Sequence, residues 1–161
     1  MNFIKRIDDL GRIVIPKDIR RIFSIQCNEN MEISVKDDEI ILKKHNILEE
    51  KDKEIIKLCN IISDISNKNI IVTDREKVFY SNIESIINKE ISDQLKEVII
   101  NRKELELGIN ITDKYKIESN YIYKPLIVDS NQTGLIIIID EDISDNDRLL
   151  LEIVSKFINT I

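Results

Sequence analysis

Six basic residues near the start of the chain have side chains suited to binding an anion such as a nucleic acid. They are Lys5, Arg6, Arg12, Lys17, Arg20 and Arg21. Arginine forms forked contacts with phosphates and guanine edges, whereas lysine acts as a point charge on phosphate. Only three acidic residues share the first 24 positions. This segment is therefore a cationic surface that could face a polyanion.

The remainder of the chain has the opposite charge balance. The first 45 residues hold nine basic and eight acidic residues, and the rest holds 15 basic and 22 acidic ones. A cationic front attached to an acidic body indicates two domains, the first of them facing an anion. The alternative is that Arg20 or Arg21 pairs with Asp8, Asp9 or Asp18 in a solvated surface cluster.

Local patterns predict which elements carry the basic residues. Apolar β-formers at residues 3–7 and 13–15 flank residues 8–11, where short acids and a glycine suit a tight connection, so we expect strand, turn and strand. Pro16 fits the first turn of a helix because its φ is fixed and it lacks a donor, which predicts a short helix over residues 17–23.

A second hairpin is predicted further along the same segment. Residues 31–36 and 39–44 alternate apolar and polar positions around two aspartates. Four short strands and one helical turn bury too little surface to be stable alone, and no disulfide or metal site compensates. We therefore expect this segment to dimerise, with its isoleucines buried inside an interleaved pair.

These residues carry a family resemblance. Residues 7–21, IDDLGRIVIPKDIRR, together with residues 31–44, MEISVKDDEIILKK, resemble the AbrB-type swapped-hairpin DNA-binding domain. The resemblance implies an obligate dimer whose strands interleave into one small β-barrel. Asn28 stands where the family commonly has glycine, which is tolerable because asparagine adopts left-handed backbone.

The resemblance also implies that arginines of this domain, residues 1–46, bind double-stranded DNA. It points to Lys5 or Arg6, and to Arg12, Arg20 and Arg21, and we add Lys17 on the same short helix. In a strand Lys5 and Arg6 point to opposite faces, so which of the two faces DNA stays open.

An amphipathic helix is predicted over residues 46–67, and we assign residues 47–67 as a linker and dimerisation helix. Its seam has apolar residues at spacings of seven, three, four and three, namely Leu48, Ile55, Leu58, Ile62 and Ile65. Fewer than three heptads are visible, so packing on its own domain and a dimeric coiled coil are equally compatible with the pattern.

Residues 68–161 are predicted to form a mixed α and β domain. A hairpin is expected over residues 70–73 and 78–80, and a second over residues 121–128 and 134–139 with a polar loop between them. Residues 135–139 are apolar at every position, which predicts a central strand covered on both faces.

Two capping boxes predict helix starts in this domain. Ser81 with Glu84 and Ser144 with Asp147 have the required spacing, and a broad apolar stripe follows the second pair. The layout is similar to regulators that join an AbrB-like domain to a GAF-like domain, so the expected class is α+β with a C-terminal GAF-like antiparallel sheet and helices.

Such a domain could hold a small-molecule effector, but aromatic residues in strands are more often plain core. Phe79, Tyr115, Tyr121 and Tyr123 are the candidates for lining a pocket, and no ligand follows from them. Cofactors and metals are not expected. His45 is the only histidine and lacks a nearby nucleophile or second ligand, so an enzyme is not expected either.

The sequence thus predicts a homodimeric, or homotetrameric, DNA-binding transcription regulator linked to sporulation or transition-state gene control. The alternatives are a partner-docking module with an antitoxin-like head, and a ligand sensor without DNA binding. No apolar run is long enough to span a bilayer, and Cys27 and Cys59 are the only thiols, which favours a cytoplasmic protein with free cysteines and no membrane partner.

Overall fold

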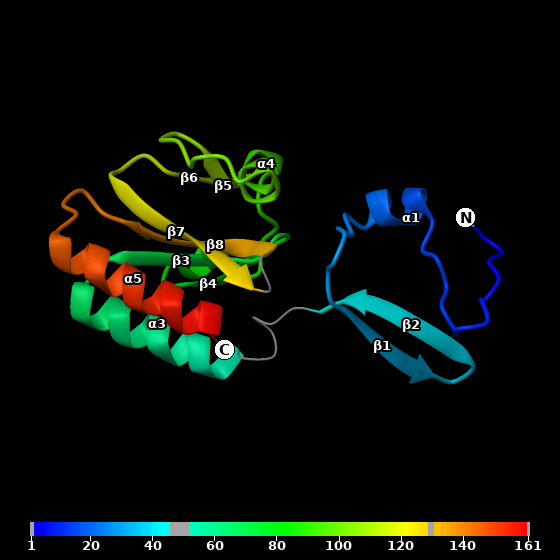
Figure 1. Cartoon of the computed structure of the whole chain (residues 1–161). Coiled ribbons are helices and arrows are strands. Elements are labelled where there is room, and N and C mark those ends of the chain that lie inside the picture. The colour runs from blue at the N-terminus through cyan, green and yellow to red at the C-terminus, as the bar shows by residue number, and fades with distance from the viewer. Residues whose placement is uncertain (1, 46–51, 129–130, 161) are drawn as a thin grey trace. The chain divides into compact units, whose positions relative to one another are not determined.

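The chain divides into two compact units, Met1–His45 and Asn46–Ile161, called the head and the body below (Figure 1). The computed structural model describes residues 2–45, 52–128 and 131–160. Helices and antiparallel sheets are combined, which gives the expected α+β class. No helix within those ranges is long and apolar enough to cross a membrane.

The head contains one short helix and one hairpin. Helix α1, Lys17–Ile22, begins directly after Pro16, and strand β1, Met31–Lys36, pairs antiparallel with β2, Glu39–Lys44. Asn28 has a φ of 62°, in the left-handed region expected for a residue that replaces glycine. These elements confirm the predicted helix and the predicted second hairpin.

The predicted strands at residues 3–7 and 13–15 are not formed in the single chain. The turn between them does close, through backbone bonds from Asp8 N–H to Arg12 C=O at 3.0 Å and from Gly11 N–H to Asp8 C=O at 2.9 Å. A strand exists only when a neighbour accepts its ladder bonds. In the described part of the head, β1 and β2 form the only sheet.

The head also lacks a core. None of residues 2–45 is buried, and several large apolar side chains are open to solvent. The most exposed include Ile4 at 98%, Val35 at 76%, Leu10 at 76% and Val14 at 74%. The hydrophobic effect that stabilises an ordinary domain is therefore unavailable to this unit alone.

The body is built on a four-stranded antiparallel sheet with the order β4-β3-β8-β7. Its strands are β3, Asn69–Thr73; β4, Val78–Ser81; β7, Tyr121–Val128; and β8, Asn131–Ile139. Consecutive residues Leu135 to Ile139 of β8 are all buried, so both faces of this central strand are covered, as predicted.

Two layers cover this sheet (Figure 1). Helices α3, Asp52–Ser66, and α5, Asp145–Thr160, pack on one face. The other face packs against α4, Asp93–Asn101, the 3-10 turn Glu84–Ile86 and the short strands β5, Asn110–Thr112, and β6, Tyr115–Lys116. Each layer encloses its own apolar cluster against the sheet.

Helix α3 packs on the body's own sheet. Ile55, Cys59 and Ile62 are buried in the cluster that α3 and α5 form against the sheet. The apolar stripe of α3 is therefore used within the chain, which supports the first of the two interpretations left open by the sequence. Ile65, at the other end of the predicted seam, is 69% exposed, and Leu48 lies outside the described residues.

The two predicted capping boxes have different outcomes. Ser144 confirms its role, because its backbone N–H donates to Asp147 Oδ2 at 2.8 Å and its Oγ accepts from Asp147 N–H at 3.3 Å. Ser81 does not start a helix; it ends β4, and its Oγ accepts from Ile83 N–H. The long helix of that region, α4, is capped instead by Ser92, whose Oγ accepts from Leu95 N–H.

The predicted polar loop between β7 and β8 is also shorter than expected. Residues 131–133 belong to β8, where Ile127 pairs with Gln132 and Leu126 with Gly134, so Thr133 is an extra residue in the ladder. This β-bulge lets polar residues continue the strand.

Gly134 is held where no side chain fits. A Cβ placed on it would lie 1.8 Å from the backbone oxygen of Thr73 in the neighbouring strand. Because that atom belongs to the backbone of the central sheet, Gly134→Ala should destabilise the body by about 3 kcal/mol or more. Urea unfolding followed by circular dichroism measures the loss.

Gly108→Ala is the matched control for this substitution. Its Cβ would meet only the end of the Lys116 side chain at 3.5 Å, although its φ of +84° is unfavourable for alanine. We expect that variant to lose only about 1–2 kcal/mol. Equal losses in the two variants would contradict the close approach at Gly134.

Candidate nucleic-acid interface

Arg12 is held in place by Asp8 across the first turn of the head. The Asp8 Oδ2 atom accepts from Arg12 Nε at 2.7 Å, and Oδ1 accepts from the backbone N–H of Leu10 and of Arg12. The backbone bond from Arg12, followed by its guanidinium, lowers the pKa of Asp8. The Arg12 side chain is still 70% exposed. Because the hydrogen bond uses Nε and most of the side chain is exposed, the guanidinium remains accessible to an anion.

Helix α1 carries Lys17, Arg20 and Arg21 at spacings that bring them to neighbouring positions on its surface. Lys17 and Arg21 are exposed, whereas Arg20 is half-buried and its Nε has no hydrogen-bond partner within the described part of the chain. Within the described part of the chain, neither Arg20 nor Arg21 forms an ion pair. Asp8, considered above as a partner for them, pairs with Arg12 instead.

Lys5 and Arg6 lie exposed in the extended segment before the turn. No hydrogen bond or ion pair among the described residues joins either of them to Arg12 or to α1. The structure therefore brings together the three basic residues of α1 and fixes Arg12 separately, and it leaves Lys5 and Arg6 unattached to both.

The four aromatic residues considered for an effector pocket do not share one. Phe79 packs in the cluster under α3 and α5, whereas Tyr115, Tyr121 and Tyr123 pack in the cluster on the opposite face of the sheet. The Tyr121 hydroxyl donates to the carbonyl of Leu105, and the Tyr123 hydroxyl accepts from Leu105 N–H at 3.2 Å. These side chains therefore help to fill and fix the core.

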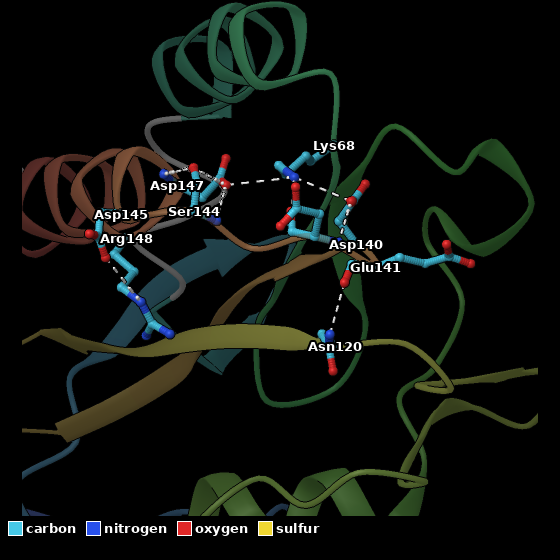
Figure 2. A network of polar contacts seen from close by, with 9 residues as sticks. Lys68, Asn120, Asp140, Glu141, Ser144, Asp145, Asp147 and Arg148 are labelled. Carbon is cyan, nitrogen blue, oxygen red and sulfur yellow. Dashed lines mark hydrogen bonds and ion pairs between the residues drawn. The ribbon is translucent and has the colours of Figure 1, made fainter.

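A partly buried polar network that the sequence did not reveal joins three parts of the body (Figure 2). The Lys68 ammonium, just before β3, lies 3.2 Å from Asp140 Oδ1 and 3.6 Å from Asp147 Oδ2, and it donates to the carbonyl of Asp142. Asp147 is also bonded to the hydroxyl of Ser144 at 2.6 Å. The sequence signal was the Ser144–Asp147 capping box, but Lys68 lies far away along the chain.

The charges of this network stabilise one another. Burial alone would lower the pKa of Lys68, but the hydrogen bond to Asp140 and the surrounding carboxylates outweigh it and raise that pKa. Burial likewise opposes ionisation of Asp147, and the bonds from Ser144 together with Lys68 still lower its pKa. This network therefore acts as a structural clamp, with all three charges in use.

The described residues do not assemble a metal-ligand cluster. They contain no group of three or more histidine, cysteine, aspartate or glutamate side chains placed to hold a metal ion. Burial raises the pKa of the Cys59 thiol to about 12, so this group stays protonated and inert.

Exposed basic residues on a small head with a β-hairpin are typical of a protein that binds an anion such as a nucleic acid. Comparisons with known proteins identify the family. The family described as "Antidote-toxin recognition MazE, bacterial antitoxin" matches residues 4–55. The chain is 30% identical over 95 residues to transition state regulatory protein AbrB of Bacillus subtilis (strain 168), covering 59% of this chain and 91% of that protein. The chain belongs to the AbrB family of transition-state regulators.

Two further relatives from the same organism extend this assignment. Stage V sporulation protein T is 29% identical over 151 residues, which cover 86% of this chain and 83% of that protein. The putative transition state regulator Abh is 43% identical over 42 residues, which cover 26% of this chain and 46% of that protein. By name, two of these relatives are transition-state regulators and the third is a sporulation protein, and none is named as an enzyme.

The polar clamp should give the body a pH-dependent stability. The pKa of Asp147 is lower in the folded chain than in the unfolded one, so its ionised form contributes stability that is present above about pH 4 and is lost as the pH falls through the folded pKa. Asp147→Asn should therefore lower the urea midpoint at neutral pH, and its difference from the unchanged protein should shrink as the pH falls below about 4 and through the folded pKa.

Asp145→Asn provides the control, because Asp145 is fully exposed and lies 4.0 Å from Arg148 at its nearest approach. That variant should unfold at nearly the same urea concentration as the unchanged protein at each pH. A gap for Asp147→Asn that stays constant from neutral to acid pH would contradict the clamp.

Proposed function

We propose that the protein is a transcription regulator that binds double-stranded DNA through its head and acts in sporulation or transition-state gene control. The observation that carries this proposal is the exposed Arg12 side chain, which Asp8 holds through Nε. Family membership and the basic helix α1 support the same conclusion.

Each basic residue has a defined part in this proposal. Arg12 and the arginines of α1 bind phosphates and guanine edges, and the lysines add charge against the backbone. The full set is Lys5, Arg6, Arg12, Lys17, Arg20 and Arg21. Because few side chains are available to read bases, sequence preference arises largely from the shape and deformability of the DNA.

The head is proposed to work as an interleaved homodimer. Its apolar residues are exposed in the single chain, and the extended segments at residues 3–7 and 13–15 have no strand partner there. A second copy that pairs with these segments would form the swapped-hairpin barrel, bury the apolar side chains and double the basic set. The exposed apolar side chains and the unpaired extended segments of the single chain both support this assembly.

The body is proposed to be a GAF-like regulatory domain, residues 68–161, joined to the DNA-binding domain, residues 1–46, by the linker of residues 47–67. A central antiparallel sheet with helices on both faces supports this assignment. The side of the α3 and α5 layer away from the sheet exposes apolar side chains, which supports pairing of dimers into a tetramer. They are Ile61, Ile65, Leu149, Ile153 and Phe157.

Regulation would pass through α3. This helix packs on the body's sheet, and it follows the head in the chain. An effector that binds the body and has different affinities for two placements of the linker helices would shift the heads between them.

The antitoxin-like alternative is favoured by one observation, the family description that matches residues 4–55. In that case the head would dock a protein partner. The body argues for the regulator, because it is a folded unit with two apolar clusters, whereas a toxin-wrapping tail is a short disordered segment.

Arg12→Ala tests DNA binding. We expect it to weaken binding by about 1–3 kcal/mol and to flatten the salt dependence by about one unit of slope for each phosphate that the side chain no longer binds. Fluorescence anisotropy on a duplex from the promoter of the protein's own gene and on a scrambled duplex, measured over a range of salt concentrations, reports both quantities.

Lys103→Ala is the control, since Lys103 is an exposed cation of the body that pairs with Glu97. It should leave DNA affinity unchanged. Absence of salt-dependent binding by the folded, assembled protein, or equal weakening in the two variants, would sink the proposal and favour the docking alternative.

A further inference from the structure

A groove runs along one edge of the body, between strand β7 and helix α5. It has a volume of about 500 Å³. Four consecutive residues of β7 and three of α5 line it, namely Tyr121, Ile122, Tyr123, Lys124, Arg148, Leu151 and Glu152. Because consecutive strand residues alternate between faces, a lining that includes all four places the strand's backbone, and not only one face of its side chains, along the groove.

The backbone edge of β7 is open at this groove. The sheet order places β7 at the edge, with β8 as its neighbour. In an antiparallel ladder alternate residues turn their N–H and C=O groups outward. Ile127 N–H donates to the Asn159 side chain at 2.8 Å and so points away from β8. The extra residue of the ladder lies on β8, so the alternation along β7 is not interrupted. The outward set on β7 is therefore Tyr121, Tyr123 and Pro125 together with Ile127.

The open edge is short. Pro125 has no N–H to donate, and Asn159 already occupies the N–H of Ile127. Tyr121 and Tyr123 therefore supply the outward N–H donors that remain, and no hydrogen bond within the described ranges uses either of them. Blocking one half of an edge strand prevents extended pairing and leaves room for a short strand at the other half.

The groove is cationic in an otherwise acidic body. Lys124 and Glu152 form an ion pair at 2.7 Å and neutralise each other. Among the described residues Arg148 pairs only with the fully exposed Asp145, at 4.0 Å, and this long surface pair leaves its guanidinium accessible to another carboxylate (Figure 2). The residues after the head hold 22 acidic against 15 basic side chains, so this local positive charge is unlike its surroundings.

We propose that this groove binds an extended acidic peptide of a partner protein, which adds as a short strand to the Tyr121–Tyr123 edge and directs a carboxylate to Arg148. The backbone bonds to the edge supply affinity, and alternate side chains of the peptide supply selectivity. On the α5 side the peptide lies over Ile122 and Leu151, and there its carboxylate meets the guanidinium.

A second copy of the chain fits this groove less well. Edge-to-edge pairing of two β7 strands would be interrupted by Pro125 in each copy. It would also bring two copies of Arg148 to one groove, where like charges repel. An acidic peptide meets neither obstacle.

The test uses the full chain and a fluorescein-labelled octapeptide of alternating valine and glutamate. In an added strand its glutamates share the α5 side with Arg148. We expect saturable binding by anisotropy and, by NMR, at least about tenfold slower amide exchange at Tyr121 and Tyr123. The amides of Ile122 and Lys124, which already face β8, should change little.

Three comparisons make the result decisive. Arg148→Gln should weaken the peptide about tenfold or more, the control Lys103→Gln should not, and the same peptide with lysine in place of glutamate should fail to bind. Arg148→Gln should also retain DNA binding, so the outcome is separable from that of the proposed function. Failure of the glutamate peptide to bind overturns the inference.

Three other results would also overturn it. If free glutamate at the same carboxylate concentration displaces the peptide, or if binding leaves the Tyr121 and Tyr123 amides unprotected, the groove holds a small acid and not a strand. If the peptide instead lowers the mass of the assembly in sedimentation, the edge is an interface between copies of the chain.

Discussion

The head cannot be held together by burial within one chain, and this constraint shapes the rest of the account. None of residues 2–45 is fully buried, although the segment is rich in isoleucine. Ordering each residue costs conformational entropy. The head by itself buries too little apolar surface to offset that cost. A second copy that supplies the missing strand partners removes the difficulty. It would also make the proposed DNA recognition symmetric, because each basic residue would then occur twice on one surface.

The body has the opposite character, since its own sheet and two layers already enclose two apolar clusters. The Lys68 clamp fixes the start of β3 to the start of α5, and Lys68 lies two residues after the end of α3. The proposed regulation would have to move α3 against a well-packed sheet. Binding of a peptide at the β7 edge would act on α5, which packs beside α3.

Elements whose partners lie close in sequence could be predicted, and those that depend on distant partners could not. The β1–β2 hairpin and the Ser144 cap were predicted because their bonds join residues only a few positions apart. The cap at Ser92 was missed because Ser81 has the same local signature, and only the sheet decides that Ser81 ends a strand. For the basic residues, types and positions were readable from the sequence. The pairing of Arg12 with Asp8 depended on the turn geometry between them.

Amide exchange in the head of the full-length protein tests the central claim most directly. In the single chain, residues 3–7 and 13–15 have no ladder, and the Asp8–Arg12 bond only closes their turn. If a second copy completes the head, these amides should be protected at least about a hundredfold, and the protection should disappear on dilution below the dissociation constant. Unprotected exchange at these residues, in a sample that sedimentation shows to be assembled and whose β1–β2 amides are protected, would contradict the account.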